Sequence, residues 1–203
     1  SVTPSAGEEF PQALPSSGGI PRAIQELMLI APFNDLDTTA AIIEAHHDEL
    51  AAVIVEPLQR VLAPQPGFLR GLRQVTARHD IPLIFDEVVT GFRLAYGGAQ
   101  EHYGVTPDLC SVGKIMGGGY PLAAVVGRSD ILSVYDKSVA DADTYVNQVG
   151  TLNGNPIACA AGLATLAELR KPGAYDGMRA VGARLRRALV DICAENGIAV
   201  QDC

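Results

Sequence analysis

The sequence contains no tryptophan, and its aromatic residues make up only 5% of the chain. It also has no uninterrupted apolar run of the ~18 to 20 residues that a bilayer-spanning helix needs. The first residues do not show the charged segment followed by an apolar segment that is typical of a signal peptide. We therefore expect a cytoplasmic protein without a membrane partner.

Paired cysteines are missing as well. The four cysteines stand far apart and form no Cys-x-x-Cys pair: Cys110, Cys159, Cys193 and Cys203. This spacing is typical of reduced thiols in a cytosolic protein rather than of disulfides or a zinc site. The neighbouring His46 and His47 would point to different faces of a helix, so we expect no metal centre.

Basic residues are scarce. Fifteen Lys and Arg stand against twenty-three Asp and Glu, which gives a formal charge of -8. Such a surface disfavours nucleic acid and anionic membranes as main partners, although it leaves room for a local anion site. Because 48% of the 203 residues are apolar, the chain has enough hydrophobic surface for a sizeable core.

Short apolar runs alternate with stretches of helical periodicity. Strands are predicted at 51–55, 81–85, 109–112 and 122–126, and helices at 35–49 and 68–79. This alternation favours an α/β fold with a mostly parallel sheet and helices on both faces.

The last third of the chain reads as two helices with a break between them. Asn155-Pro156 predicts a capped helix start, and the Ala- and Leu-rich helix that follows to Leu169 is expected to be buried. The Lys171-Pro172-Gly173 break predicts a boundary between a domain at 1–171 and a second domain that begins at 172–203. A helix with one apolar stripe and one arginine-rich face follows the break, and residues 198–200 would then start another strand.

Lys114 is the first candidate for chemistry, because several common catalytic patterns are absent. The chain has no Gly-x-Ser-x-Gly elbow and no phosphate-binding P-loop. Lys114 follows a strand and precedes three glycines, so we expect a partly desolvated, nucleophilic amine. A solvated loop lysine is the alternative that the residues alone leave open.

Asp86 is the second candidate. It ends a wholly apolar strand, which places its carboxylate at the sheet edge where ligands of open α/β folds bind. It could pair with a protonated ring nitrogen, cap a helix or form a structural salt bridge. Lys114 follows it by 28 residues, which is enough for one crossover and a return to the same edge.

Thr151 belongs to the third candidate segment, the polar turn at 150–156. A turn of this kind leads into a helix N-terminus, where free backbone N–H groups favour an anion, and Thr151 adds a hydroxyl donor. A well-capped helix without a ligand is the alternative for this segment alone.

Four segments taken together resemble the class III pyridoxal-phosphate aminotransferases of fold type I. They are VIVEP at 53–57, IPLIFDEVVTGFR at 81–93, PDLCSVGKIMGGGYPLAAVVGR at 107–128 and GTLNGNPIACAAG at 150–162. Their order and spacing agree with the family from about residue 32 to residue 169. The DEVVTGFR and GTLNGNP segments are most similar to the glutamate-1-semialdehyde aminomutase-like branch.

The resemblance implies a role for each candidate. Lys114 would hold pyridoxal 5'-phosphate as a Schiff base and move a proton between the substrate and the cofactor. Asp86 would keep the pyridinium nitrogen protonated, and Val88 would pack against one face of the ring. Thr151 would reach the phosphate in the neighbouring subunit of a homodimer. The small-molecule partners would be an amino donor and an oxo acceptor.

The chain also departs from the family pattern. Val89 replaces a glutamine that many members have, and the family's phosphate loop and ring-stacking aromatic lie before the region that matches Ser1. The chain thus resembles a central fragment, with residues 1–171 as part of the cofactor-binding large domain and 172–203 as the start of the small domain. Three functions stay open: an aminotransferase, an aminomutase or epimerase, and a non-catalytic truncated homologue.

Overall fold

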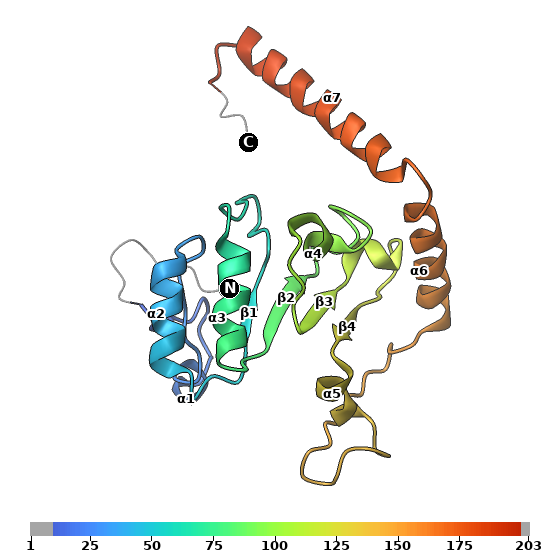
Figure 1. The fold of residues 1–203 in the computed structure, drawn as a ribbon. Coiled ribbons are helices and arrows are strands. Elements are labelled where there is room, and N and C mark those ends of the chain that lie inside the picture. Colours follow the sequence, from blue (N-terminus) through green and yellow to red (C-terminus); the bar gives the residue numbers. More distant parts are fainter. Residues whose placement is uncertain (1–9, 200–203) are drawn as a thin grey trace.

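The computed structural model describes residues 10–199 of the chain, and a four-stranded sheet forms its centre (Figure 1). The sheet has the order β1-β2-β3-β4. Its strands are β1 (Val53–Val55), β2 (Leu83–Glu87), β3 (Leu109–Val112) and β4 (Ala124–Gly127).

The strand directions match the predicted class. β1, β2 and β3 run parallel to one another, whereas β4 runs antiparallel to β3. The four predicted strands are all present, with boundaries that shift by up to two residues. The prediction of an α/β fold with a mostly parallel sheet is confirmed.

Helices lie between the strands along the chain and follow the last strand. The α-helices are α1 (Arg22–Gln25), α2 (Leu36–His46), α3 (Phe68–Arg78), α4 (Gly98–Tyr103), α5 (Ser129–Leu132), α6 (Pro156–Leu169) and α7 (Ala174–Glu195). Two 3-10 helices complete the set: η1 (Lys114–Gly117) and η2 (Ser133–Tyr135). Within residues 10–199, no helix combines the length and the apolar character that crossing a bilayer requires.

The alternation along β2 sends its side chains to two different environments. Leu83, Phe85 and Glu87 are buried, whereas Ile84 and Asp86 point to the opposite face and are only half-buried. The buried face packs with the apolar side of α3 and with one residue of α2 into a single core: Ile43, Phe68, Leu69, Leu72, Val75, Ile81, Leu83, Phe85, Val105, Cys110 and Val112. This packing fixes which residues of β2 face outward.

The opposite face of the sheet remains open. Ile54 on β1 is 60% exposed and Val125 on β4 is 53% exposed, and both lie on the same face as Asp86 and Ser111 by register. The half-buried carboxylate of Asp86 therefore lies among accessible apolar side chains.

Helix α6 starts as predicted but is not buried as predicted. Asn155 caps it, since its Oδ1 accepts from the backbone N–H groups of Ile157 and Ala158 at 3.0 and 3.1 Å. Only Ala158 and Gly162 are buried, because the helix approaches η1 so closely there that a Cβ on Gly162 would lie 3.0 Å from the backbone oxygen of Met116. The other faces of α6 have no second layer over them in the described part of the chain, so the expected burial is wrong.

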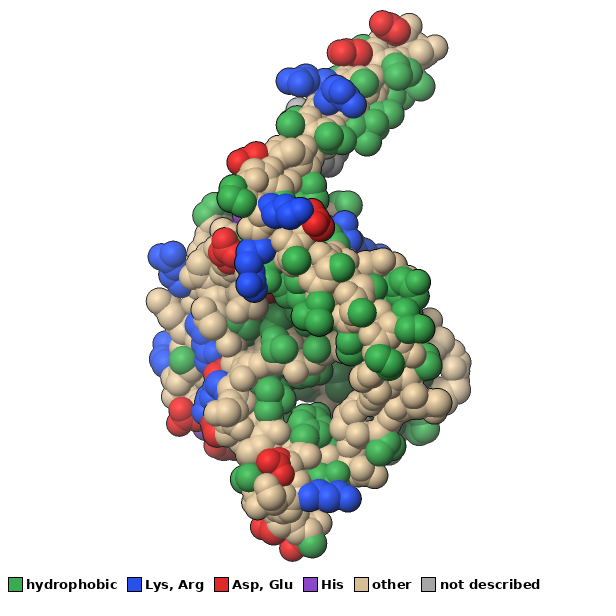
Figure 2. Space-filling view, turned by 90° about the vertical axis from the view of Figure 1, so that its right-hand side faces the viewer, with side chains coloured by type: hydrophobic (Ala, Val, Ile, Leu, Met, Phe, Trp, Pro, Cys, Tyr) green, Lys and Arg blue, Asp and Glu red, His purple; other side chains and the backbone are tan. Residues whose placement is uncertain are grey.

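Helix α7 projects away from the sheet, and none of its residues is buried (Figure 1). Figure 2 shows basic side chains on one side of this helix and hydrophobic ones on the other. Its apolar stripe is between 41% and 60% exposed: Met178, Val181, Leu185, Leu189 and Ile192. Residues 198 and 199 form no strand, and Val200 lies outside the described residues. The domain boundary at residue 172 stays a prediction.

Three side chains around the break between α6 and α7 hold these two helices to the turn that follows β2. The Tyr175 hydroxyl donates to the backbone oxygen of Phe92 at 2.9 Å, and Arg179 donates to that of Leu94 at 3.1 Å. Arg170 donates to the Tyr96 hydroxyl at 2.7 Å and lies over its ring. The last helices therefore contact the segment that begins a few residues after Asp86.

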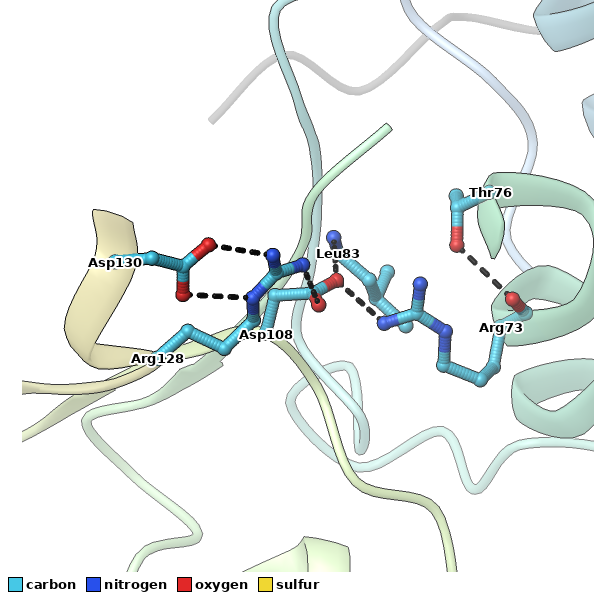
Figure 3. Close-up of polar contacts among 6 residues, drawn as sticks. All are labelled: Arg73, Thr76, Leu83, Asp108, Arg128 and Asp130. Carbon is cyan, nitrogen blue, oxygen red and sulfur yellow. Dashed lines mark hydrogen bonds and ion pairs between the residues drawn. The ribbon is translucent and has the colours of Figure 1, made fainter. Parts of the chain in front are cut away.

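Asp108 joins three elements at the amino-terminal edge of the parallel strands (Figure 3). Its carboxylate pairs with Arg73 of α3 and Arg128 after β4, and it accepts the Leu83 N–H at 2.8 Å. Burial alone would raise the pKa of Asp108, but these hydrogen bonds and the two guanidinium groups outweigh burial and lower the pKa. This edge of the sheet is thus closed by paired charges.

Candidate functional site

Asp86 lies at the other edge of the sheet, beside Ser111 of β3. Its Oδ1 accepts from the Ser111 hydroxyl at 3.0 Å and from the Val88 N–H at 3.1 Å. No ion pair within residues 10–199 involves Asp86. The other oxygen, Oδ2, accepts no hydrogen bond in that range and is not buried. One side of the carboxylate is therefore held, and the other is free for a ligand.

Lys114 follows the neighbouring strand. β3 ends at Val112, beside Glu87 of β2, and Gly113 is extended with φ -170° before Lys114 turns to φ 47°. A left-handed backbone conformation is unusual for a side-chain-bearing residue and often marks a functional position. The Lys114 side chain is exposed, so the expected enclosure is not present within the described chain. No hydrogen bond or ion pair in that part of the chain engages its amine.

Val88 connects these two positions. A Cβ placed on Gly113 would lie 3.6 Å from Val88 Cγ1, which is an ordinary contact distance. The side chain of Val88 thus lies next to the residue that precedes Lys114, and its backbone N–H holds Asp86. The structure therefore gathers Asp86, Val88 and Lys114 at the carboxyl ends of β2 and β3.

Thr151 belongs to a different segment of the chain, the turn that precedes α6. It is exposed in the turn before α6 and lines a hollow of about 570 Å³ together with Gln148, Val149, Gly150 and Asn153. No hydrogen bond within residues 10–199 links Thr151 to Asp86 or Lys114.

Glu87 is a polar residue of this edge that the sequence reasoning did not single out. It is fully buried, although it directly follows Asp86 in the chain. Its carboxylate accepts from the Thr90 hydroxyl, from the backbone N–H groups of Ala99 and Gln100, and from the Gln100 side chain. Two consecutive acids at the end of a strand were the available signal, since alternation sends one of them to the buried face.

The thiol of Cys110 reports the electrostatic character of this edge. Burial, together with the negative charges of Glu87 and Asp86, raises its pKa to about 12. No basic side chain in the described part of the chain forms an ion pair with either acid. A cationic group bound next to Asp86 would therefore gain electrostatic stabilisation.

The residues at this edge fit a ring with an aldehyde at one end and a protonated nitrogen at the other. Lys114 offers an exposed side chain with an amine, Asp86 offers a carboxylate oxygen that no other residue among 10–199 engages, and Val88 offers an apolar contact surface beside both. The profile of the Aminotransferase class-III family matches residues 3–202.

The chain belongs to the class III aminotransferase family. Members of this family use pyridoxal phosphate, in agreement with the resemblance of the four segments. The fold of the class III chain is similar to that of a solved omega-transaminase from Sphaerobacter thermophilus, with a TM-score of 0.85 and 41% identity over 95% of this chain and 44% of the other.

Two further relatives agree with the family. A solved transaminase with PLP bound has a TM-score of 0.83 and 28% identity, covering 92% of this chain and 44% of its own. The glutamate-1-semialdehyde 2,1-aminomutase 2 of Brevibacillus brevis is 50% identical over 188 residues, which is 91% of this chain and 43% of that protein. The chain thus spans less than half the length of these relatives.

Proposed function

We propose that the protein is a pyridoxal-phosphate-dependent aminotransferase that moves an amino group from a small-molecule amino donor to an oxo acceptor. The observation that carries this proposal is the carboxylate of Asp86, which Ser111 and Val88 hold on one side and leave open on the other. Lys114 follows the adjacent strand, so the amine and the carboxylate belong to the same edge of the sheet.

Three residues at the sheet edge have distinct roles in this proposal. Lys114 binds the cofactor through its Nζ and, once released by the substrate, carries a proton to and from the substrate carbon. Asp86 accepts a hydrogen bond from the cofactor's ring nitrogen and keeps it protonated. Val88 supports one face of the ring. When bound, the cofactor supplies an electron-withdrawing ring that stabilises negative charge on the substrate carbon.

Thr151 serves a different site in the proposal. In line with the family resemblance, we assign its hydroxyl to the cofactor phosphate in the partner subunit of a homodimer. The turn at 150–155 feeds the N-terminus of α6, and Asn155 already caps that helix. Because Asn155 already engages the N–H groups of Ile157 and Ala158, the Thr151 hydroxyl is the donor that this proposal assigns to the phosphate.

The chain offers a direct test with matched controls, because its sequence has three lysines: Lys114, Lys137 and Lys171. The full-length protein is incubated with pyridoxal phosphate, reduced with borohydride, digested and mapped by mass spectrometry. We expect label on Lys114, and we expect Lys114→Ala to lose both the visible cofactor band and turnover. Lys137→Ala and Lys171→Ala should retain both. An unchanged band in Lys114→Ala would overturn the assignment.

An aminomutase is the second candidate, favoured by the 50% identity with the Brevibacillus brevis enzyme. The same amine and carboxylate would serve amino transfer within one molecule, and an epimerase would use the same proton movements. An isotopically labelled amino donor separates these outcomes. Label in a second molecule supports the aminotransferase, and label retained in the rearranged donor supports the aminomutase. A protein that binds no cofactor would be the non-catalytic homologue.

A further inference from the structure

Glu87 holds two segments together beneath Asp86. Its side chain accepts from Thr90 at 3.0 Å and from the Gln100 backbone and side chain at 3.1 and 3.2 Å. Its backbone oxygen accepts the Gly91 N–H at 2.8 Å. One residue thus fixes both the turn that follows β2 and the first turn of α4.

Two glycines lie so close to Glu87 that neither position has room for a side chain. Gly98 has φ +75°, and a Cβ there would lie 2.4 Å from Glu87 Oε2. Gly91 has the same kind of constraint, since a Cβ there would lie 2.8 Å from the Glu87 backbone oxygen. Both glycines therefore allow the backbone to approach Glu87 closely, as a side chain would not.

Burying a carboxylate costs free energy, and an apolar residue of similar size would fill the same core without that cost. Stability alone therefore does not explain a fully buried, fully hydrogen-bonded acid at this position. The neighbour in sequence suggests the explanation. Alternation along β2 means that whatever locks Glu87 inward also locks Asp86 outward.

We propose that Glu87 is a positioning residue for Asp86, holding the end of β2 so that the Asp86 carboxylate meets the cofactor's ring nitrogen. This inference rests on the proposed function. Glu87 itself faces away from the cofactor side of the sheet and acts only through the backbone it shares with Asp86.

The test measures the pH midpoint of the visible absorption band of the bound cofactor. If Glu87 only stabilised the fold, its substitution would leave this midpoint unchanged. A protonated ring nitrogen makes the nitrogen through which the cofactor is bound less basic, so weaker pairing with Asp86 raises the pH midpoint of the band. Among the titratable groups near Glu87, Cys110 stays neutral because its pKa is raised to about 12. Glu101 of α4 accepts the Gly97 N–H at 2.6 Å and belongs to a separate contact.

The test compares two substitutions that each remove a buried charge from the full-length protein loaded with pyridoxal phosphate. In Glu87→Gln we expect the midpoint to rise by about one pH unit. In the control, Asp108→Asn, the lost carboxylate lies at the opposite edge of the sheet, so we expect the wild-type midpoint. Equal midpoints in Glu87→Gln and the wild type, or equal shifts in the two variants, would overturn the proposal.

A milder variant keeps the test decisive if Glu87→Gln does not fold. Thr90→Val preserves the shape of a buried residue and removes one donor to Glu87, so a smaller shift in the same direction is expected. No shift in folded Thr90→Val, with Glu87→Gln unfolded, counts against positioning. The failure of the proposed function is distinguishable, because the wild type would then show neither a titrating band nor borohydride label on Lys114.

Discussion

The carboxylates at the two edges of the sheet differ in their partners. At the amino-terminal edge, Asp108 is paired with Arg73 and Arg128 and accepts a backbone N–H. At the carboxyl-terminal edge, Asp86 has only a hydroxyl and a backbone N–H as partners. The first edge has internal charge compensation, whereas the second lacks it within residues 10–199. An edge whose acids form no ion pair with a described residue is suited to a cationic ligand.

The largest expected effect tests the functional side of this contrast. Asp86→Asn removes the charge opposite the cofactor's ring nitrogen, and we expect turnover to fall by about 10²- to 10³-fold. The free energy of unfolding should change little, because Asp86 is only half-buried and forms no ion pair in the described chain. Steady-state kinetics and urea unfolding measure the two quantities. If the loss of unfolding free energy exceeded the loss of transition-state stabilisation calculated from turnover, the two edges would not differ as described.

The reciprocal change is Asp108→Asn. It leaves the Arg73 guanidinium, which is 24% exposed, without its anionic partner, and we expect the protein to lose about 3 kcal/mol of unfolding free energy. Cofactor affinity should stay close to that of the wild type, because Asp108 lies at the far edge. Chemical denaturation and cofactor titration report the outcome, and a selective loss of affinity without destabilisation would contradict this division.

Gly98→Ala sharpens the comparison at a smaller scale. Its φ of +75° and the 2.4 Å approach of Glu87 Oε2 both oppose a side chain, so we expect a loss of about 2 kcal/mol. Gly67→Ala is the matched control, since Gly67 has φ +89° but no atom within 4 Å of the added Cβ. We expect about 1 kcal/mol there, measured by thermal or urea unfolding. Equal losses would mean that the crowding by Glu87 contributes nothing.

Acid provides the smallest effect. Because the folded-state pKa of Asp108 is lowered from its ordinary 3.8, its ion pairs stabilise the protein fully above that pH. This stabilisation is lost as the pH falls below 3.8 through the lowered pKa. Asp108→Asn should therefore lose less stability than the wild type as the pH falls from above 3.8 to below it. Circular dichroism during urea unfolding at each pH checks this, and parallel losses in both proteins would contradict it.

Much of the sheet was predictable because its strands are short apolar runs, such as 81–85, that end at polar residues. The position of Asp86 at the sheet edge followed from the same reading. Helix α4 was not predicted, because it is short, starts at a glycine and depends on the distant carboxylate of Glu87. Such long-range hydrogen bonds leave no periodic signal in the sequence.

Two expectations about burial were wrong for a shared reason. Lys114 was expected to be enclosed and α6 to be buried, because apolar and small neighbours usually indicate a packed environment. In the structure, α6 packs through Ala158 and Gly162 alone, and Lys114 remains exposed. The apolar composition of α6 and of the segment around Lys114 shows that these surfaces can pack against a second layer. It does not show which residues would form that layer.

The reversed direction of β4 separates the two halves of the proposed dimeric site along the chain. After Lys114 the polypeptide passes through β4 back to the opposite edge, where the Arg128 N–H reaches the Asp108 oxygen at 2.9 Å. From Arg128 the chain continues through α5 and η2 to the turn that contains Thr151. In a homodimer, each protomer would thus extend its Thr151 segment from the edge of the sheet that Asp108 and Arg128 join by an ion pair, opposite to the edge that carries its own Lys114.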